Sequence, residues 1–177
     1  MAKRTIYKWG NKSLEEETFK INNKKVTATR VVSRNAIIII PILKGDKIVL
    51  ERQYRKGVKK WIYELPAGGI EKGEKPINAV KRELQEEVGY FPRKVKYLFK
   101  AYINPGLETE LDYYFVVTDL VNSRKEMDDD EVIDKKIVSV PELIKMVNKN
   151  QILDGTSLAG ILYYLYNKNK INQILED

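Results

Sequence analysis

The chain contains no histidine and no cysteine among its 177 residues. These two absences exclude nucleophilic sites of the Ser-His-Asp or Cys-His type, disulfide bonds, and zinc sites built from thiolate or imidazole ligands. Any catalysis must therefore use carboxylates, amines, hydroxyls and backbone groups, or a metal ion that prefers oxygen ligands, such as Mg²⁺.

Long hydrophobic segments are also absent. The longest apolar run, residues 36–43, has eight residues, whereas a membrane-spanning helix needs about 20. The N-terminus shows no signal-peptide pattern, so we expect a cytoplasmic protein without membrane contact. A hydrophobic content of 43% with only 6 Pro and 10 Gly is typical of a globular protein, and the length predicts one main domain.

The composition includes an excess of positive charge. There are 32 Lys and Arg against 25 Asp and Glu, which gives a formal net charge of +7. Such a charge suits polyanionic ligands, from phosphorylated metabolites to nucleic acids. A general richness in lysine is the simpler explanation, so the charge alone does not select a ligand.

The chain divides into two regions, residues 1–34 and residues 35–177. In the first, two strand-like segments flank Asn22-Asn23 and predict a β-hairpin. A hairpin is only marginally stable alone, so we expect it to pack on the second region or on another copy of the chain. In the second region strand patterns interleave with helix patterns, as in α/β or α+β sandwiches. Strands are expected at 36–43, 47–54, 61–65, 95–102, 111–120 and 132–140, helices at 76–88, 141–148 and 156–167, and a solvated acidic loop at 128–131.

The segment 76–88 carries the most informative pattern. Ile77, Val80, Leu84 and Val88 recur at helical spacing and predict an apolar stripe, and the later helix is expected to bury Leu158, Ile161, Leu162 and Leu165. Glu83, Glu86 and Glu87 stand at i, i+3 and i+4, so all three point toward one region of a helix surface. Such a cluster is either a solvated face or a site for a cation such as Mg²⁺, to which the glycine-rich turn Ala67-Gly68-Gly69 can add a backbone carbonyl.

The glutamates belong to a longer pattern, G-x5-E-x7-R-E-U-x-E-E-x-G-U, in which U is a bulky apolar residue. It runs from Gly68 to Tyr90 and resembles the Nudix box, except that Tyr90 replaces the usual aliphatic residue. The resemblance implies an α/β/α sandwich with a mixed β-sheet and Mg²⁺-dependent hydrolysis of a nucleoside diphosphate linked to another group, with Mn²⁺ able to substitute. It also implies that Glu83, Glu86, Glu87 and the Ala67 carbonyl hold the metal, while Arg82 and Glu74 orient the box.

The similarity extends beyond the box to the ADP-ribose pyrophosphatase subfamily. Arg52-Gln53-Tyr54-Arg55, Glu64 to Gly68 and the loop around Pro105 resemble its motifs. By that resemblance Glu110 activates the attacking water, although Glu108 competes for this role. Each motif also has an ordinary structural explanation, such as a charged edge strand or a tight turn. The residues expected to contact the substrate are Arg52, Gln53, Arg55, Glu64, Pro105, Gly106 and Glu108.

Enzymes of this subfamily are dimers, so the resemblance implies that residues 1–34 exchange with a partner chain in a homodimer. Arg34-Asn35-Ala36 departs from the Pro-Gly-Ala usual before the first core strand. The predicted function is Mg²⁺-dependent hydrolysis of ADP-ribose to AMP and ribose 5-phosphate. One alternative is another nucleoside diphosphate sugar, such as ADP-glucose or GDP-mannose. The other is a non-catalytic module that binds ADP-ribose or RNA, which the intact acidic box makes the weaker hypothesis.

Overall fold

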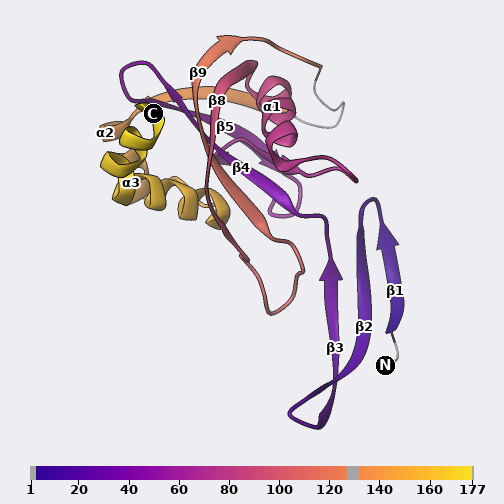
Figure 1. Ribbon diagram of the computed structural model, residues 1–177. Helices are drawn as coiled ribbons and strands as arrows, with labels where there is room; N and C mark the ends of the chain where they lie inside the picture. Colours follow the sequence, from indigo (N-terminus) through magenta and orange to yellow (C-terminus); the bar gives the residue numbers. More distant parts are fainter. Residues whose placement is uncertain (1–2, 127–131, 177) are drawn as a thin grey trace.

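The computed structural model describes residues 3–126 and 132–176, so the acidic run at 128–131 lies outside the described residues. The N-terminal region is a three-stranded antiparallel sheet made of β1 (Lys3–Trp9), β2 (Lys12–Ile21) and β3 (Lys24–Val32). The predicted hairpin is confirmed, because Asn22 (φ 47°) and Asn23 (φ 65°) form the tight turn between β2 and β3. Strand β1 was not predicted. Figure 1 shows this N-terminal sheet projecting away from the rest of the molecule.

The second sheet forms the centre of the body, with the order β10-β5-β4-β9-β8 and with β6 and β7 paired to β5 and β4. Strand β4 runs parallel to β9 and antiparallel to β5 and β7, so the sheet is mixed. Its strands are β4 (Ala36–Leu43), β5 (Lys47–Arg55), β6 (Lys60–Glu64), β7 (Ala67–Gly69), β8 (Tyr90–Ala101), β9 (Asp112–Asn122) and β10 (Ile133–Ser139).

Helices cover both faces of this sheet, with α1 (Pro76–Glu87) on one side and α2 (Val140–Asn148) and α3 (Gly155–Glu176) on the other (Figure 1). Strand β4 is buried on both faces because its β-branched residues alternate between two cores. Ile37 and Ile39 pack with α1, whereas Ile38 and Ile40 pack with α2 and α3. The predicted α/β/α sandwich with a mixed sheet is therefore confirmed. None of the helices in the described residues is long and apolar enough to cross a membrane.

Three details of the prediction are wrong. Ile77 and Leu162 were expected in the core but are 41% and 48% exposed, because they lie beside the buried stripes of their helices rather than on them. Helix α3 continues to Glu176 instead of ending near residue 167, since Ile171 extends its buried face. Strand β8 begins at Tyr90, five residues before the expected start, and pairs with β9 from there.

The N-terminal sheet is joined to the body through the loop that precedes β9. The Val31 amide donates to the Leu107 carbonyl (2.8 Å), and the Thr109 amide donates to the Val31 carbonyl (3.1 Å). The Ser33 amide donates to the Thr109 hydroxyl (3.1 Å). These bonds extend β3 alongside the loop, so the position of the N-terminal sheet helps to fix the backbone of residues 107–109.

Candidate active site

Helix α1 turns its apolar face to the sheet and its acidic face to a polar surface that Arg82 organises. Arg82 Nη1 donates to Glu83 (2.6 Å) and Glu86 (3.2 Å), and Arg82 Nη2 donates to the Gly69 carbonyl (3.0 Å). Its Nε and Nη2 also donate to the two oxygens of Glu74 (3.1 and 3.0 Å). Burial opposes the charge of Arg82, but the bonds to Glu74 and Glu83 outweigh it and raise the pKa of Arg82.

The loop before the helix fits closely against the glutamates. The Ala67 amide donates to Glu87 Oε2 (3.0 Å), and Glu87 is only 4% exposed. A Cβ atom at Gly68 would lie 2.0 Å from the carboxyl carbon of Glu83. Any side chain at position 68 would therefore displace that carboxylate. Steric exclusion thus explains why this position is a glycine.

The donor set of this region fits a hard cation in kind. Glu83, Glu86 and Glu87 supply carboxylate oxygens near the backbone of Ala67. Because Gly68 has no side chain, the Glu83 carboxylate can lie directly against the loop. In residues 3–126 and 132–176, no three acidic side chains converge closely enough to be assigned as one ligand group. Arg82 instead bonds to both Glu83 and Glu86 and supplies the compensating positive charge.

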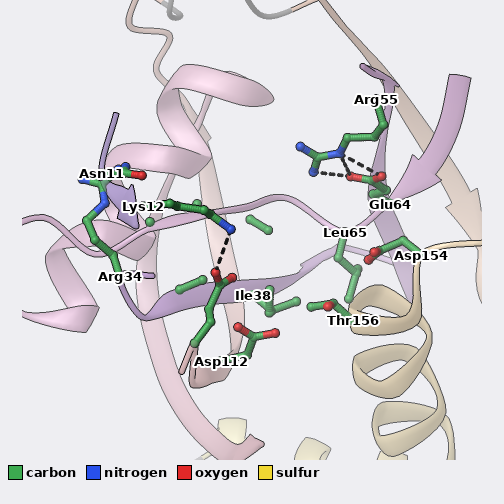
Figure 2. A pocket seen from close by; sticks show the side chains of 15 residues that line it. Asn11, Lys12, Arg34, Ile38, Arg55, Glu64, Leu65, Asp112, Asp154 and Thr156 are labelled. Carbon is green, nitrogen blue, oxygen red and sulfur yellow. Dashed lines mark hydrogen bonds and ion pairs between the residues drawn. The ribbon is translucent and has the colours of Figure 1, made fainter. Parts of the chain in front are cut away.

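A cavity of about 270 Å³ lies beside this region, between the N-terminal sheet and the body. Figure 2 shows Arg55 and Glu64 at one end of it and Asn11 and Arg34 at the other. Arg55 Nε donates to both carboxylate oxygens of Glu64 (3.0 and 2.8 Å), and its Nη2 donates to Glu64 as well. Burial opposes the charge of Arg55, but the Glu64 carboxylate outweighs burial and raises the pKa of Arg55. Arg55 is thus a fixed cation in the wall.

Acidic groups from the loop before β9, from the first residue of β9 and from the residue before α3 line the same cavity. Glu110 pairs with Lys12 of the N-terminal sheet, with 3.3 Å between Nζ and Oε2. Asp112 is 3% exposed, and its Oδ1 has no hydrogen-bond partner among the described residues. Burial, followed by the charge of Glu110, raises the pKa of Asp112 to about 6. Asp154 accepts from the Ser157 amide (2.7 Å) and so caps α3.

The structure brings together some of the residues predicted from the sequence and separates others. A second cavity, of about 230 Å³, shares Arg34 and Ala67–Gly69 with the first. Glu110 is in the wall of the first cavity, whereas Glu108 is in neither wall.

Other predicted residues lie away from both cavities. Arg52 lies over the Trp61 ring (5.0 Å to the centroid), and Gln53 is buried at 6% exposure. Of the predicted residues, Arg55, Glu64, Ala67 and Glu110 line the first cavity, Ala67, Arg82, Glu83 and Glu86 line the second, and Arg52, Gln53, Glu87, Pro105, Gly106 and Glu108 line neither.

Sequence reasoning missed several residues of the first cavity. Asp112 had a usable signal, because it stands two residues after Glu110, at the start of the strand that follows the predicted catalytic loop. Asp154 also had one, since an aspartate three residues before Ser157 is a typical helix cap. Asn11 and Lys12 had none, because only the packing of the N-terminal sheet on the body brings their turn to the cavity.

A glutamate helix beside a cavity with arginines in its wall, on an α/β/α sandwich, suits the binding of a phosphorylated ligand together with a divalent cation. The chain belongs to the NUDIX domain family, which it matches over residues 32–155. It is 29% identical over 166 residues to an ADP-ribose pyrophosphatase of Bacillus subtilis (strain 168), covering 92% of this chain and 90% of that protein.

Other relatives carry different names. A methanol dehydrogenase activator of Bacillus methanolicus is 34% identical over 77% of this chain and 76% of its own length. A GDP-mannose pyrophosphatase of Enterobacter sp. (strain 638) is 30% identical over 72% of this chain and 71% of its own length. The fold matches a crystal structure of an ADP compounds hydrolase with a TM-score of 0.84 at 21% identity, covering 96% of this chain and 94% of that one.

Proposed function

We propose that the protein hydrolyses the pyrophosphate of ADP-ribose to AMP and ribose 5-phosphate with Mg²⁺, or with Mn²⁺ in its place. The observation that carries this proposal is the wall that the two cavities share at Arg34 and Ala67–Gly69. A diphosphate lying across this wall has the glutamates of α1 on one side and Arg55 and Glu110 on the other. The similarity to the Bacillus subtilis enzyme supports ADP-ribose as the substrate.

The residues would divide the work as follows. Glu83, Glu86, Glu87 and the Ala67 carbonyl would hold Mg²⁺, which neutralises diphosphate charge and acidifies a bound water when present. Arg55, held in one orientation by Glu64, binds a phosphate oxygen through its guanidinium fork. Arg82 keeps the glutamates in place from behind.

We propose Glu110 as the general base. It lines the cavity, whereas Glu108 lies outside both cavity walls. In the reaction, water attacks one phosphorus, its proton passes to the Glu110 carboxylate, and the bond from that phosphorus to the bridging oxygen breaks. The second phosphate leaves with the bridging oxygen, mainly as a dianion at neutral pH, and Glu110 then releases the proton to solvent.

The test is incubation of the purified protein with ADP-ribose and Mg²⁺, followed by separation of the products. AMP and ribose 5-phosphate are expected from wild type with metal, and neither product from a sample with EDTA. Glu83→Gln should form them far more slowly, because it removes a carboxylate while keeping the shape of the side chain. Equal product formation by wild type with and without EDTA would refute the metal dependence.

Hydrolysis of another nucleoside diphosphate sugar is the second candidate. The similarity to GDP-mannose pyrophosphatase over 72% of this chain favours it. A panel of ADP-ribose, ADP-glucose and GDP-mannose compared by kcat/KM decides between the two. A GDP-mannose value above that of ADP-ribose would select this candidate instead of the first.

We also propose a homodimer in which the N-terminal sheets are exchanged. Two chains that exchange these sheets would retain the β3 contacts with Leu107 and Thr109, now made between chains. Such a site would contain residues of both subunits. Size-exclusion chromatography with light scattering should give twice the chain mass of 20.6 kDa, and a mass equal to one chain would refute the exchange.

A further inference from the structure

Arg34 occupies a position that the proposed mechanism does not use. It lies in the short linker between β3 and β4, and it lines both cavities. Its Nε and Nη2 donate to the side-chain oxygen of Asn11, with 2.8 Å from Nε, in the orientation of the Asn11 amide that satisfies both groups. Asn11 thus restrains the guanidinium of a residue that lines both cavities.

Arg34 differs from the other cations of the two cavity walls in the groups that it contacts. The other cations of the two walls have carboxylate partners: Lys12 pairs with Glu110, Arg55 with Glu64, and Arg82 with Glu74, Glu83 and Glu86. Within the described part of the chain, no carboxylate oxygen lies within 4 Å of Arg34, and its hydrogen bonds go to the neutral amide of Asn11. At longer range its charge helps to lower the pKa of Glu74, after the larger effect of Arg82. An arginine without a carboxylate partner in a cavity wall is available to an anion.

The box loop leaves room for this guanidinium. A Cβ atom at Gly69 would lie 3.0 Å from Arg34 Nη2 and 3.2 Å from its central carbon. The Gly69 carbonyl accepts a hydrogen bond from Arg82 Nη2 (3.0 Å), so the guanidiniums of Arg34 and Arg82 both lie close to this glycine. A side chain at position 69 would push Arg34 away from the junction of the cavities.

We propose that Arg34 is a binding residue for the diphosphate of the substrate, acting from the end of the cavity opposite Arg55 (Figure 2). This inference rests on the proposed function and deepens it. Glu64 fixes one guanidinium and Asn11 fixes the other, at opposite ends of the cavity. A charged diphosphate that lies between them can accept hydrogen bonds from both. Guanidinium forks match phosphate oxygens in geometry and retain their charge at every working pH.

The test measures binding without turnover. Isothermal titration calorimetry in EDTA gives the affinities of wild type, Arg34→Gln and Arg34→Lys for inorganic pyrophosphate and for ADP-ribose. Arg34→Gln should weaken both by about 10- to 100-fold, the usual effect of losing hydrogen bonds to a charged group. Arg34→Lys should fall between, because it keeps the charge and loses the fork. The matched control is Arg4→Gln, since Arg4 is an exposed arginine of the N-terminal sheet that pairs with Glu16 outside both cavity walls.

Several outcomes would overturn the inference. The first is that Arg34→Gln binds pyrophosphate and ADP-ribose within twofold of wild type, which is the result expected of Arg4→Gln. The second is that wild type binds neither of these two ligands. A third is a fall in unfolding temperature for both Arg34 variants with no affinity recovered by lysine, which would assign Arg34 to holding the linker. If wild type binds pyrophosphate through Arg34 but hydrolyses no nucleotide sugar, the proposed function fails and the inference stands. With an active enzyme, Arg34→Gln should raise KM more than it lowers kcat.

Discussion

The N-terminal sheet and the body of this protein are stabilised in different ways. The body buries two apolar clusters, one on each face of the central sheet. No residue of the N-terminal sheet belongs to the buried part of either cluster, and all seven described residues of β1 are exposed. Because the sheet has so little apolar surface to bury, it depends on cross-strand pairs and on its junction with the loop before β9.

Polar pairs take the place of a core in the N-terminal sheet. Glu15 is 7% exposed and pairs with Lys3 (2.9 Å), while Glu17 pairs with Arg30 (2.6 Å). Partly exposed ion pairs stabilise weakly. What this region contributes to the site is the turn with Asn11 and Lys12, which closes one end of the cavity. The body therefore supplies most of the stability and the α1 glutamates, whereas the N-terminal sheet supplies side chains that line one end of the cavity.

The largest expected difference between the two regions is catalytic. Glu86 and Glu16 each pair with an arginine at 3.2 Å, one on α1 and one in the N-terminal sheet. Glu86→Gln should lower kcat/KM on the order of 10³-fold if Glu86 holds the proposed Mg²⁺, because losing such a ligand removes several kcal/mol of transition-state stabilisation. Glu16→Gln should leave it within about twofold. Equal effects on kcat/KM would contradict the assignment of the α1 glutamates.

The next difference concerns stability. Leu143 is fully buried in α2, away from both cavities, whereas Ile6 of β1 is 46% exposed. Leu143→Ala should lower the free energy of unfolding by about 2–5 kcal/mol through lost burial and a new cavity. Ile6→Ala should lower it by less than about 1 kcal/mol. Urea unfolding followed by circular dichroism measures both, and a larger cost at Ile6 would show that β1 is covered by another chain.

The pH dependence of stability tests the buried carboxyl of the cavity. Asp112 has a pKa of about 6 in the folded protein and about 3.9 when unfolded. The unfolded chain therefore releases this proton first, and the folded state loses up to about 3 kcal/mol as pH rises from about 4 to 7. Asp112→Asn has no carboxyl to titrate and so avoids this loss. The unfolding free energy of the variant minus that of wild type should therefore be more positive at pH 8 than at pH 4. A difference in unfolding free energy independent of pH would contradict the raised pKa.

Most of the fold was predictable because its signals are local. The β-branched run at 36–43 is long and apolar enough to indicate a strand buried on both faces, and β4 is such a strand. The glutamate spacing together with Pro76 and Gly89 indicated α1 within a residue of its end. Strand β1 was missed because its exposed sequence has no alternating apolar pattern to mark it.

Only part of the wall of the first cavity could be predicted from the sequence. Arg55 and Glu110 stand in motifs that a sequence can match, and both line the cavity. Arg52 and Gln53 stand in the same motif, but the cation–π contact of Arg52 with Trp61 and the burial of Gln53 place them elsewhere. Lys12 lies 98 positions before Glu110, and such a contact depends on tertiary packing alone.

The smallest expected effect tests an ion pair that joins the two regions at the cavity, between Lys12 and Glu110. Lys12 Nζ lies 3.3 Å from Glu110 Oε2 and restrains the proposed base. Because the pair is partly exposed, its loss should be worth only about 1 kcal/mol, or roughly a fivefold fall in kcat for Lys12→Gln. Lys8→Gln, an exposed lysine in β1 outside the cavity walls, is the matched control and should change kcat less than twofold. If both variants keep the kcat of wild type, the N-terminal sheet acts on this site through Asn11 and Arg34 rather than through Glu110.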